Sequence, residues 1–121
     1  MLVQVSGTIQ SVAPAIAAVE RSALDYNFVP SILGRCGVGL LVAAFVPLAT
    51  DPPSAMNYAA AVSALRGLLP AGASAVVARC PREAKLHFDV WGEPAGDLDC
   101  MRAVKRALDP GDVLNRGRFV V

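Results

Sequence analysis

The feature of this chain that most restricts its fold is the order in which two hydrophobic periods alternate. Apolar residues at every second position indicate half-buried strands, whereas spacings of three and four indicate amphipathic helices. In chain order these patterns predict a strand at 2–9, a helix from 12 to about 26, strands at 28–36 and 38–46, a helix between 54 and 70, a strand at 73–80, a further strand at 85–90 and a final helix from 101 to 108. The first six elements follow the βαββαβ order of a ferredoxin-like α+β fold, an antiparallel sheet with helices on one face. The last strand and the C-terminal helix are appended to it.

The composition predicts a single domain, residues 1–121, with more apolar residues than its interior needs. Hydrophobic residues make up 55% of the chain and charged residues 17%, an apolar balance for a domain with so much surface per unit volume. We therefore expect one face to be covered by another subunit or domain. The net charge of +1 is not the basic footprint that nucleic-acid binding needs, so we expect no nucleic-acid partner.

The cysteines and the hydropathy pattern predict a cytoplasmic protein. Cys36, Cys80 and Cys100 are odd in number and form no C-x-x-C pair, which argues against a disulfide framework and a structural zinc site. We expect them to be small buried residues. The most apolar run, 37–49, is shorter than the roughly 18 residues of a membrane-spanning helix, and the first seven residues lack the pattern of a signal peptide. No transmembrane segment and no bound metal are predicted.

Two local groups of residues are candidates for a site, and neither is specific. Gly34, Gly37 and Gly39 have the spacing G-x-x-G-x-G and precede a strand pattern, not the helix that a phosphate-binding loop requires, so a hairpin turn or bulge is the better interpretation. His87 is the only histidine and shares a face of its predicted strand with Asp89. Such a pair can serve in acid–base chemistry, but a solvated strand face explains it better. No catalytic residue is predicted.

The last 21 residues contain the most specific motif. Met101, Val104 and Leu108 fall on one face of the predicted helix, and Asp109-Pro110-Gly111 ends it. Together with Asn115-Arg116-Gly117, this string resembles the C-terminal signature of FAD-linked oxidases of the vanillyl-alcohol oxidase type. There, a final helix runs into the pattern D-P-x-x-hydrophobic-L-N-P-G-K/R. Within that family the likeness is to the FAD-binding subunit of bacterial glycolate oxidases.

The resemblance implies the C-terminal cap domain of an FAD-dependent oxidoreductase. In such proteins an N-terminal domain, which these 121 residues do not contain, holds the FAD, and the cap covers the isoalloxazine and shapes the substrate cavity. The implied reaction is the oxidation of a small 2-hydroxy acid such as glycolate, with a hydride passing to the flavin. The implied partners are the FAD-binding domain or other oxidase subunits. We expect the chain alone to be inactive.

The resemblance also implies three site residues. Asn115 and Gly117 belong to the tail that contacts the cofactor in the family, although Arg116 stands where the family has proline, which removes a fixed backbone angle. Many relatives have a G-H-x-G-D/N-G-N-L-H type segment beside the flavin, where this chain has residues 34–41, Gly-Arg-Cys-Gly-Val-Gly-Leu-Leu. The histidines and the asparagine are missing, and Arg35 is the charged group left to bind a substrate carboxylate.

A different class of function accounts for the same apolar surplus. A free-standing ferredoxin-like module that dimerises through its sheet and binds a small ligand or a protein needs no missing domain. A soluble homodimer that buries one open sheet face would favour this alternative, whereas a monomer that exposes apolar surface would favour the cap. The tail has an alternative of its own, in which it docks on the sheet through Phe119 and Val120.

Overall fold

The computed structural model describes residues 1–48, 53–92 and 97–116. Within these ranges four strands and two long helices follow one another in the predicted order: β1 (Leu2–Ser6), α1 (Val12–Asp25), β2 (Phe28–Arg35), β3 (Leu40–Pro47), α2 (Ala55–Leu68) and β4 (Ser74–Arg79). The strands form one sheet in the order β2-β3-β1-β4, and all neighbouring strands are antiparallel. This is the α+β topology of a ferredoxin-like fold, as predicted.

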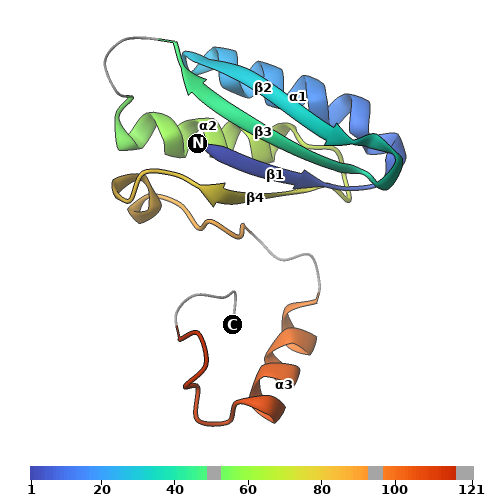
Figure 1. The fold of residues 1–121 in the computed structure, drawn as a ribbon, viewed down its shortest axis with the longest axis vertical. Helices are drawn as coiled ribbons and strands as arrows, with labels where there is room; N and C mark the ends of the chain where they lie inside the picture. The colour runs from blue at the N-terminus through green and yellow to red at the C-terminus, as the bar shows by residue number, and fades with distance from the viewer. Residues whose placement is uncertain (49–52, 93–96, 117–121) are drawn as a thin grey trace.

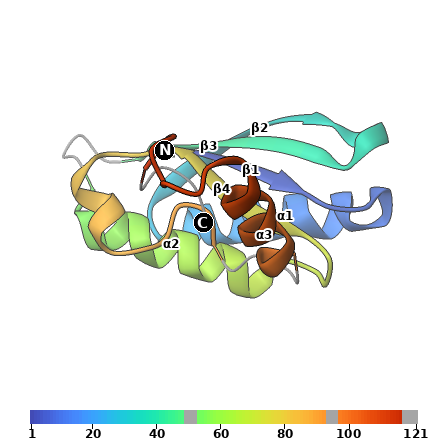
Figure 2. The ribbon, with the colours of Figure 1, turned by 90° about the horizontal axis from the view of Figure 1, so that it is seen from below.

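The sheet is covered on one face and open on the other. Figures 1 and 2 show α1 and α2 lying on the same side of the four strands, so that sheet and helices form two layers. The core lies between these layers. Phe28 is its aromatic centre, with ring centroids 5.9 Å from Phe45 and 5.1 Å from Tyr58. The largest fully buried side chains are Phe28, Phe45, Leu41, Leu65, Val3, Val5, Val19 and Val62.

The glycine-rich segment is a hairpin turn between β2 and β3, as predicted. Residues Cys36–Val38 form one 3-10 turn, and Gly39 follows in the left-handed region with φ = 69°. A Cβ atom on Gly39 would lie 2.0 Å from the carbonyl oxygen of Gly7, so a side chain is sterically excluded there. The N–H of Gly7 donates to the Gly39 carbonyl at 2.9 Å. The glycine therefore allows the hairpin to lie against the end of β1.

The prediction of a strand at 85–90 is wrong, because these residues do not form one. Residues Glu83–Leu86 form a 3-10 helix, η3, and the chain then runs irregularly beside β4. One backbone hydrogen bond, from the N–H of Val77 to the carbonyl of Val90 at 2.8 Å, joins this segment to the sheet edge. Ala84 is buried and η3 packs against α2. A short alternating pattern does not distinguish an edge strand from a segment that packs against a helix.

The first strand is shorter than predicted. β1 ends at Ser6, and Ile9–Ser11 form a 3-10 turn, η1, that leads into α1. Val3 and Val5 are buried, whereas Ile9, which a strand extending to residue 9 would place on the same face, is 63% exposed. The turn ends the alternation because 3-10 geometry places side chains every third residue, not on alternate faces.

The last helix, α3 (Leu98–Leu108), forms where it was predicted but lies apart from the two layers (Figure 1). None of its residues is buried, and Val104 and Leu108 on its apolar side are 52% and 78% exposed. We call the described residues of 1–92 the body and residues 97–116 the C-terminal unit.

Among the described residues, no helix has the length and apolarity required to span a bilayer.

Candidate functional site

The sheet face opposite α1 and α2, which we call the open sheet face, is largely apolar, with Gln4, Ser6, Ser31 and Ser74 as its uncharged polar residues. Along each strand, alternate residues point into the core and the others point away from the helices. Leu33 is 78% exposed there, and Val29 and Val46 are 42% and 49% exposed. The apolar members of the open sheet face are Leu2, Val29, Leu33, Leu40, Val42, Ala44, Val46 and Val76. This surface is the exposed apolar face that the composition predicts.

Two arginines are the only charged residues in the four strands. None of the four strands contains an acidic residue, and their charged residues are Arg35, which ends β2, and Arg79, which ends β4. Arg35 lies opposite Leu40 and Arg79 opposite Leu2, at opposite ends of the sheet. Neither arginine forms an ion pair within the described residues. Arg35 is exposed and free to bind a carboxylate through paired donors.

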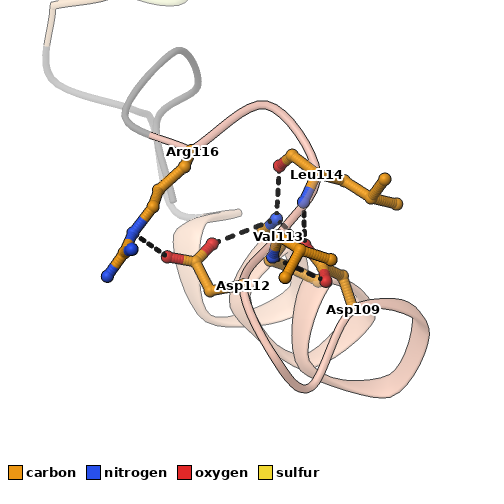
Figure 3. Close-up of polar contacts among 6 residues, drawn as sticks. Asp109, Asp112, Val113, Leu114 and Arg116 are labelled. Carbon is orange, nitrogen blue, oxygen red and sulfur yellow. Dashed lines mark hydrogen bonds and ion pairs between the residues drawn. The ribbon is translucent and has the colours of Figure 1, made fainter.

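The C-terminal unit is held together by the carboxylate of Asp109, just after α3 (Figure 3). Its Oδ1 accepts a hydrogen bond from the N–H of Val113 at 3.0 Å, and its Oδ2 accepts one from the N–H of Leu114 at 2.9 Å. The ammonium of Lys105 pairs with the same carboxylate and donates to the carbonyl oxygen of Leu114 at 2.8 Å. These contacts fold residues 110–114 back against the end of the helix, and we call them the Asp109 staple.

The Asp109 staple shifts the protonation of both partners toward their charged forms. The hydrogen bond from Lys105, followed by those from the N–H groups of Val113 and Leu114, lowers the pKa of Asp109 from 3.8 to about 2. The hydrogen bond to Asp109 raises the pKa of Lys105, and a second one to Asp112 adds to that effect. Only 22% of the Lys105 side chain is exposed, although Lys105 lies on a helix none of whose residues is fully buried.

The structure places Asn115 beside this staple. Asn115 has φ = 51°, in the left-handed region that asparagine tolerates better than most residues. It lines a hollow of about 580 Å³ together with the apolar side of α3 and Leu114. Gly117, Phe119 and Val120 lie outside the described residues. The described part of the tail, residues 109–116, hydrogen-bonds to α3 and not to the sheet.

The predicted site residues are not brought together. Arg35 lies by the β2–β3 turn and Asn115 lies in the C-terminal unit, and these segments are well separated in Figure 1. Sequence analysis missed the role of Asp109 beyond ending the helix. The signal that could have revealed it is the position of Lys105 one helical turn earlier, since residues four apart lie on the same helix face.

The other candidates from the sequence lie elsewhere. His87 and Asp89 are exposed in the irregular segment beside β4, so they do not share a strand face as predicted. The expectation that the cysteines are buried is wrong, since Cys36 and Cys100 are exposed, Cys80 is partly buried, and all three are free. Within the described ranges, no three histidine, cysteine or acidic side chains gather as ligands for a metal ion.

The N-termini of α2 and α3 do not present free N–H groups to a pyrophosphate such as that of FAD. A pyrophosphate needs free N–H groups at a helix N-terminus. In α3 that end has the carboxylates of Asp97 and Asp99, and in α2 the hydroxyl of Ser54 already accepts from the N–H of Asn57 at 3.2 Å. The open sheet face, in contrast, is apolar and without acidic residues, which suits an uncharged ring system.

Comparison with known proteins adds no assignment. No protein-family model, no curated protein and no solved structure matches this chain.

Proposed function

We propose that this chain is the C-terminal cap domain of an FAD-dependent oxidoreductase that acts on a small 2-hydroxy acid such as glycolate, and that it is inactive alone. The observation that carries the proposal is the open sheet face, an apolar surface without acidic residues that has Arg35 at one end. The motif from Asp109 to Gly117 supplies the flavin oxidase assignment by resemblance.

The amount of exposed surface supports a role that requires a partner. The chain exposes 7874 Å². A folded monomer of 12.6 kDa is expected to expose about 6200 Å², which is about 1700 Å² less. A standard protein–protein interface takes about 800 Å² from each partner. The excess is about twice the area that one partner contributes to a standard interface.

Each part of the chain has a separate task in this proposal. FAD, held by the partner domain, would supply the hydride acceptor for the oxidation of the substrate. The open sheet face excludes water from the flavin ring, and Arg35 binds the carboxylate of the 2-hydroxy acid through paired N–H donors. The Asp109 staple fixes the tail as far as Leu114, and the family resemblance implies that Asn115 and Gly117 would contact the cofactor. This chain provides binding and orientation, and no proton-transfer residue is assigned.

The test uses complementation. The purified chain with added FAD is expected to turn over neither glycolate nor lactate. Mixed with a glycolate oxidase FAD-binding subunit truncated before its own cap, it is expected to restore flavin bleaching by glycolate. Turnover by the chain alone would contradict its role as a cap.

Two arginine variants test the substrate assignment, because both residues end a strand and neither forms an ion pair within the described residues. In the complemented enzyme, Arg35→Met is expected to raise the KM for glycolate by about tenfold or more, the effect of losing a charged hydrogen bond. Arg79→Met is the matched control and should leave the KM unchanged. Equal changes in both variants would remove Arg35 from the substrate site.

The alternative function relies on the same surface. A free-standing module that dimerises sheet to sheet would also cover the open sheet face. Light scattering of the purified chain distinguishes the two proposals. A stable homodimer that Leu33→Lys converts to a monomer, without loss of fold, would favour the module over the cap.

A further inference from the structure

A second hollow, of about 560 Å³, lies on the helix-covered side of the sheet, between α2, the start of β4 and the segment 87–92. Its size falls within the range of about 300–1000 Å³ that is usual for small-molecule sites. The residues that matter for its chemistry are Arg66, Phe88, Asp89 and Trp91. The hollow thus combines one guanidinium, one carboxylate and the rings of Phe88 and Trp91, and His87 also lines it.

Arg66 is fixed in place with part of its guanidinium unused. Its Nε and Nη2 donate to the carbonyl of Ala75 at 3.3 and 3.2 Å, and Nη2 also donates to the carbonyl of Val90 at 3.2 Å. Its Nη1 has no hydrogen-bond partner among the described residues. Gly92 lies against the guanidinium, since a Cβ there would be 3.0 Å from its Cζ. Arg66 therefore presents two N–H donors in a fixed position.

Asp89 is held in a similar way. Its Oδ1 accepts a hydrogen bond from the N–H of Trp91 at 2.9 Å, and its Oδ2 has no partner among the described residues. Burial lowers the pKa of Arg66, and the nearby charge of Asp89 opposes that shift. The two side chains nevertheless form no ion pair within 4 Å. Opposite charges therefore face one hollow without neutralising each other directly.

We propose that this hollow binds a small zwitterion, an amino acid with an apolar side chain. Its carboxylate accepts from Nη1 of Arg66, its ammonium donates to Asp89, and its side chain packs against Phe88 and Trp91. A simple carboxylate would be repelled by Asp89 and a simple amine by Arg66, so the pair of charges selects a ligand that has both.

The first test is an amide NMR titration of the full chain with L-phenylalanine. Saturable shifts of the Gly92 amide and the Trp91 indole are expected. The analogues 3-phenylpropanoate, which lacks the ammonium, and 2-phenylethylamine, which lacks the carboxylate, are each expected to bind at least about tenfold more weakly, since each loses a charged hydrogen bond. No saturable shift with phenylalanine at millimolar concentrations would overturn the proposal. So would 3-phenylpropanoate binding as tightly as phenylalanine.

The second test is Asp89→Asn, which keeps an Oδ1 acceptor for the Trp91 N–H and removes the charge. It is expected to weaken phenylalanine binding at least about tenfold and to leave 3-phenylpropanoate binding unchanged or tighter. Asp97→Asn, outside the hollow, is the control and should bind as the unaltered chain does. Equal weakening of both ligands by Asp89→Asn would overturn the ammonium contact. These outcomes are independent of the proposed function, because the hollow and the open sheet face lie on opposite sides of the sheet.

Discussion

The body and the C-terminal unit are held together by different forces. In the body, residues far apart in the chain share one buried core between the sheet and two helices. In the C-terminal unit no residue of α3 is buried, and the structure depends on one carboxylate that joins Lys105, Val113 and Leu114. The stabilisation from hydrophobic burial is proportional to the apolar area buried, so a single substitution on the surface removes little of it. A polar staple depends on one side chain and one protonation state.

The difference indicates which region folds by itself. The body has its own core, although its open sheet face remains uncovered. The C-terminal unit fixes only its local geometry, and its apolar side, including Val104 and Leu108, is more than half exposed. We expect the body to behave as a cooperative folding unit and the C-terminal unit to open independently of it.

The largest expected effect is on the body. Phe28→Ala removes a fully buried ring that contacts Phe45 and Tyr58, and we expect it to lower the free energy of unfolding by about 3–5 kcal/mol. Denaturant unfolding followed by Trp91 fluorescence measures this change. Val29→Ala, at the neighbouring exposed position, should change it by less than about 0.5 kcal/mol. If Phe28→Ala also shifted the amides of Val113 and Leu114, the two regions would not be independent.

The next effect is confined to the C-terminal unit. Asp109→Ala removes the acceptor of two N–H groups and of Lys105, and we expect hydrogen-exchange protection of the Val113 and Leu114 amides to fall at least about tenfold. The denaturation midpoint of the body should not change. Asp112→Asn is the control, because Asp112 is more than half exposed and the N–H groups of Val113 and Leu114 donate to Asp109 and not to Asp112. A loss of body stability in Asp109→Ala would show that the unit supports the core.

The same staple should respond to acid. The pKa of Asp109 is lowered from 3.8 to about 2, so its stabilising effect is complete above about pH 5 and is lost as the pH falls below 3.8 toward 2. The amide shifts of Val113 and Leu114, followed from pH 6 downward, should titrate together with a midpoint near 2. The strands contain no acidic residue, so the amides in the middle of β1 and β3 should not follow this transition. A midpoint at 3.8 would mean that the staple does not form.

The smallest expected effect is the change in the free energy of unfolding at Leu108 on α3, which we compare with that at Leu65 on α2. Leu108→Ala on α3 alters a side chain that is 78% exposed, so the free energy of unfolding should change by less than about 0.5 kcal/mol. Leu65→Ala on α2 alters a fully buried one and should cost about 2–5 kcal/mol. Thermal or denaturant unfolding of the two variants provides the comparison. A large cost at Leu108 would indicate that the apolar side of α3 is covered in solution.

Most of the fold could be predicted from local pattern, and the candidate site could not. The glycine turn and the αβ order follow from residue spacing, because backbone geometry and one-sided burial impose periods of two and 3.6. Arg35 as a substrate-binding residue stays a prediction from the family resemblance, and the absence of acidic residues from the strands is visible in the sequence itself. Asp109 contacts the tail, and Arg66 and Asp89 line one hollow, only because loops turn back at particular places. The local sequence pattern does not specify these places.

The order of the elements, the position of the hairpin at Gly39 and the surplus of apolar residues all follow from local sequence, because each depends on the chemistry of neighbouring residues. Tertiary structure alone decided that residues 85–90 lie beside the sheet without forming a strand, and which apolar faces are covered. An alternating segment becomes a strand only where a partner strand supplies hydrogen bonds along its length. Likewise, an apolar stripe is buried only where another element packs against it, and for the open sheet face and α3 the described chain supplies none.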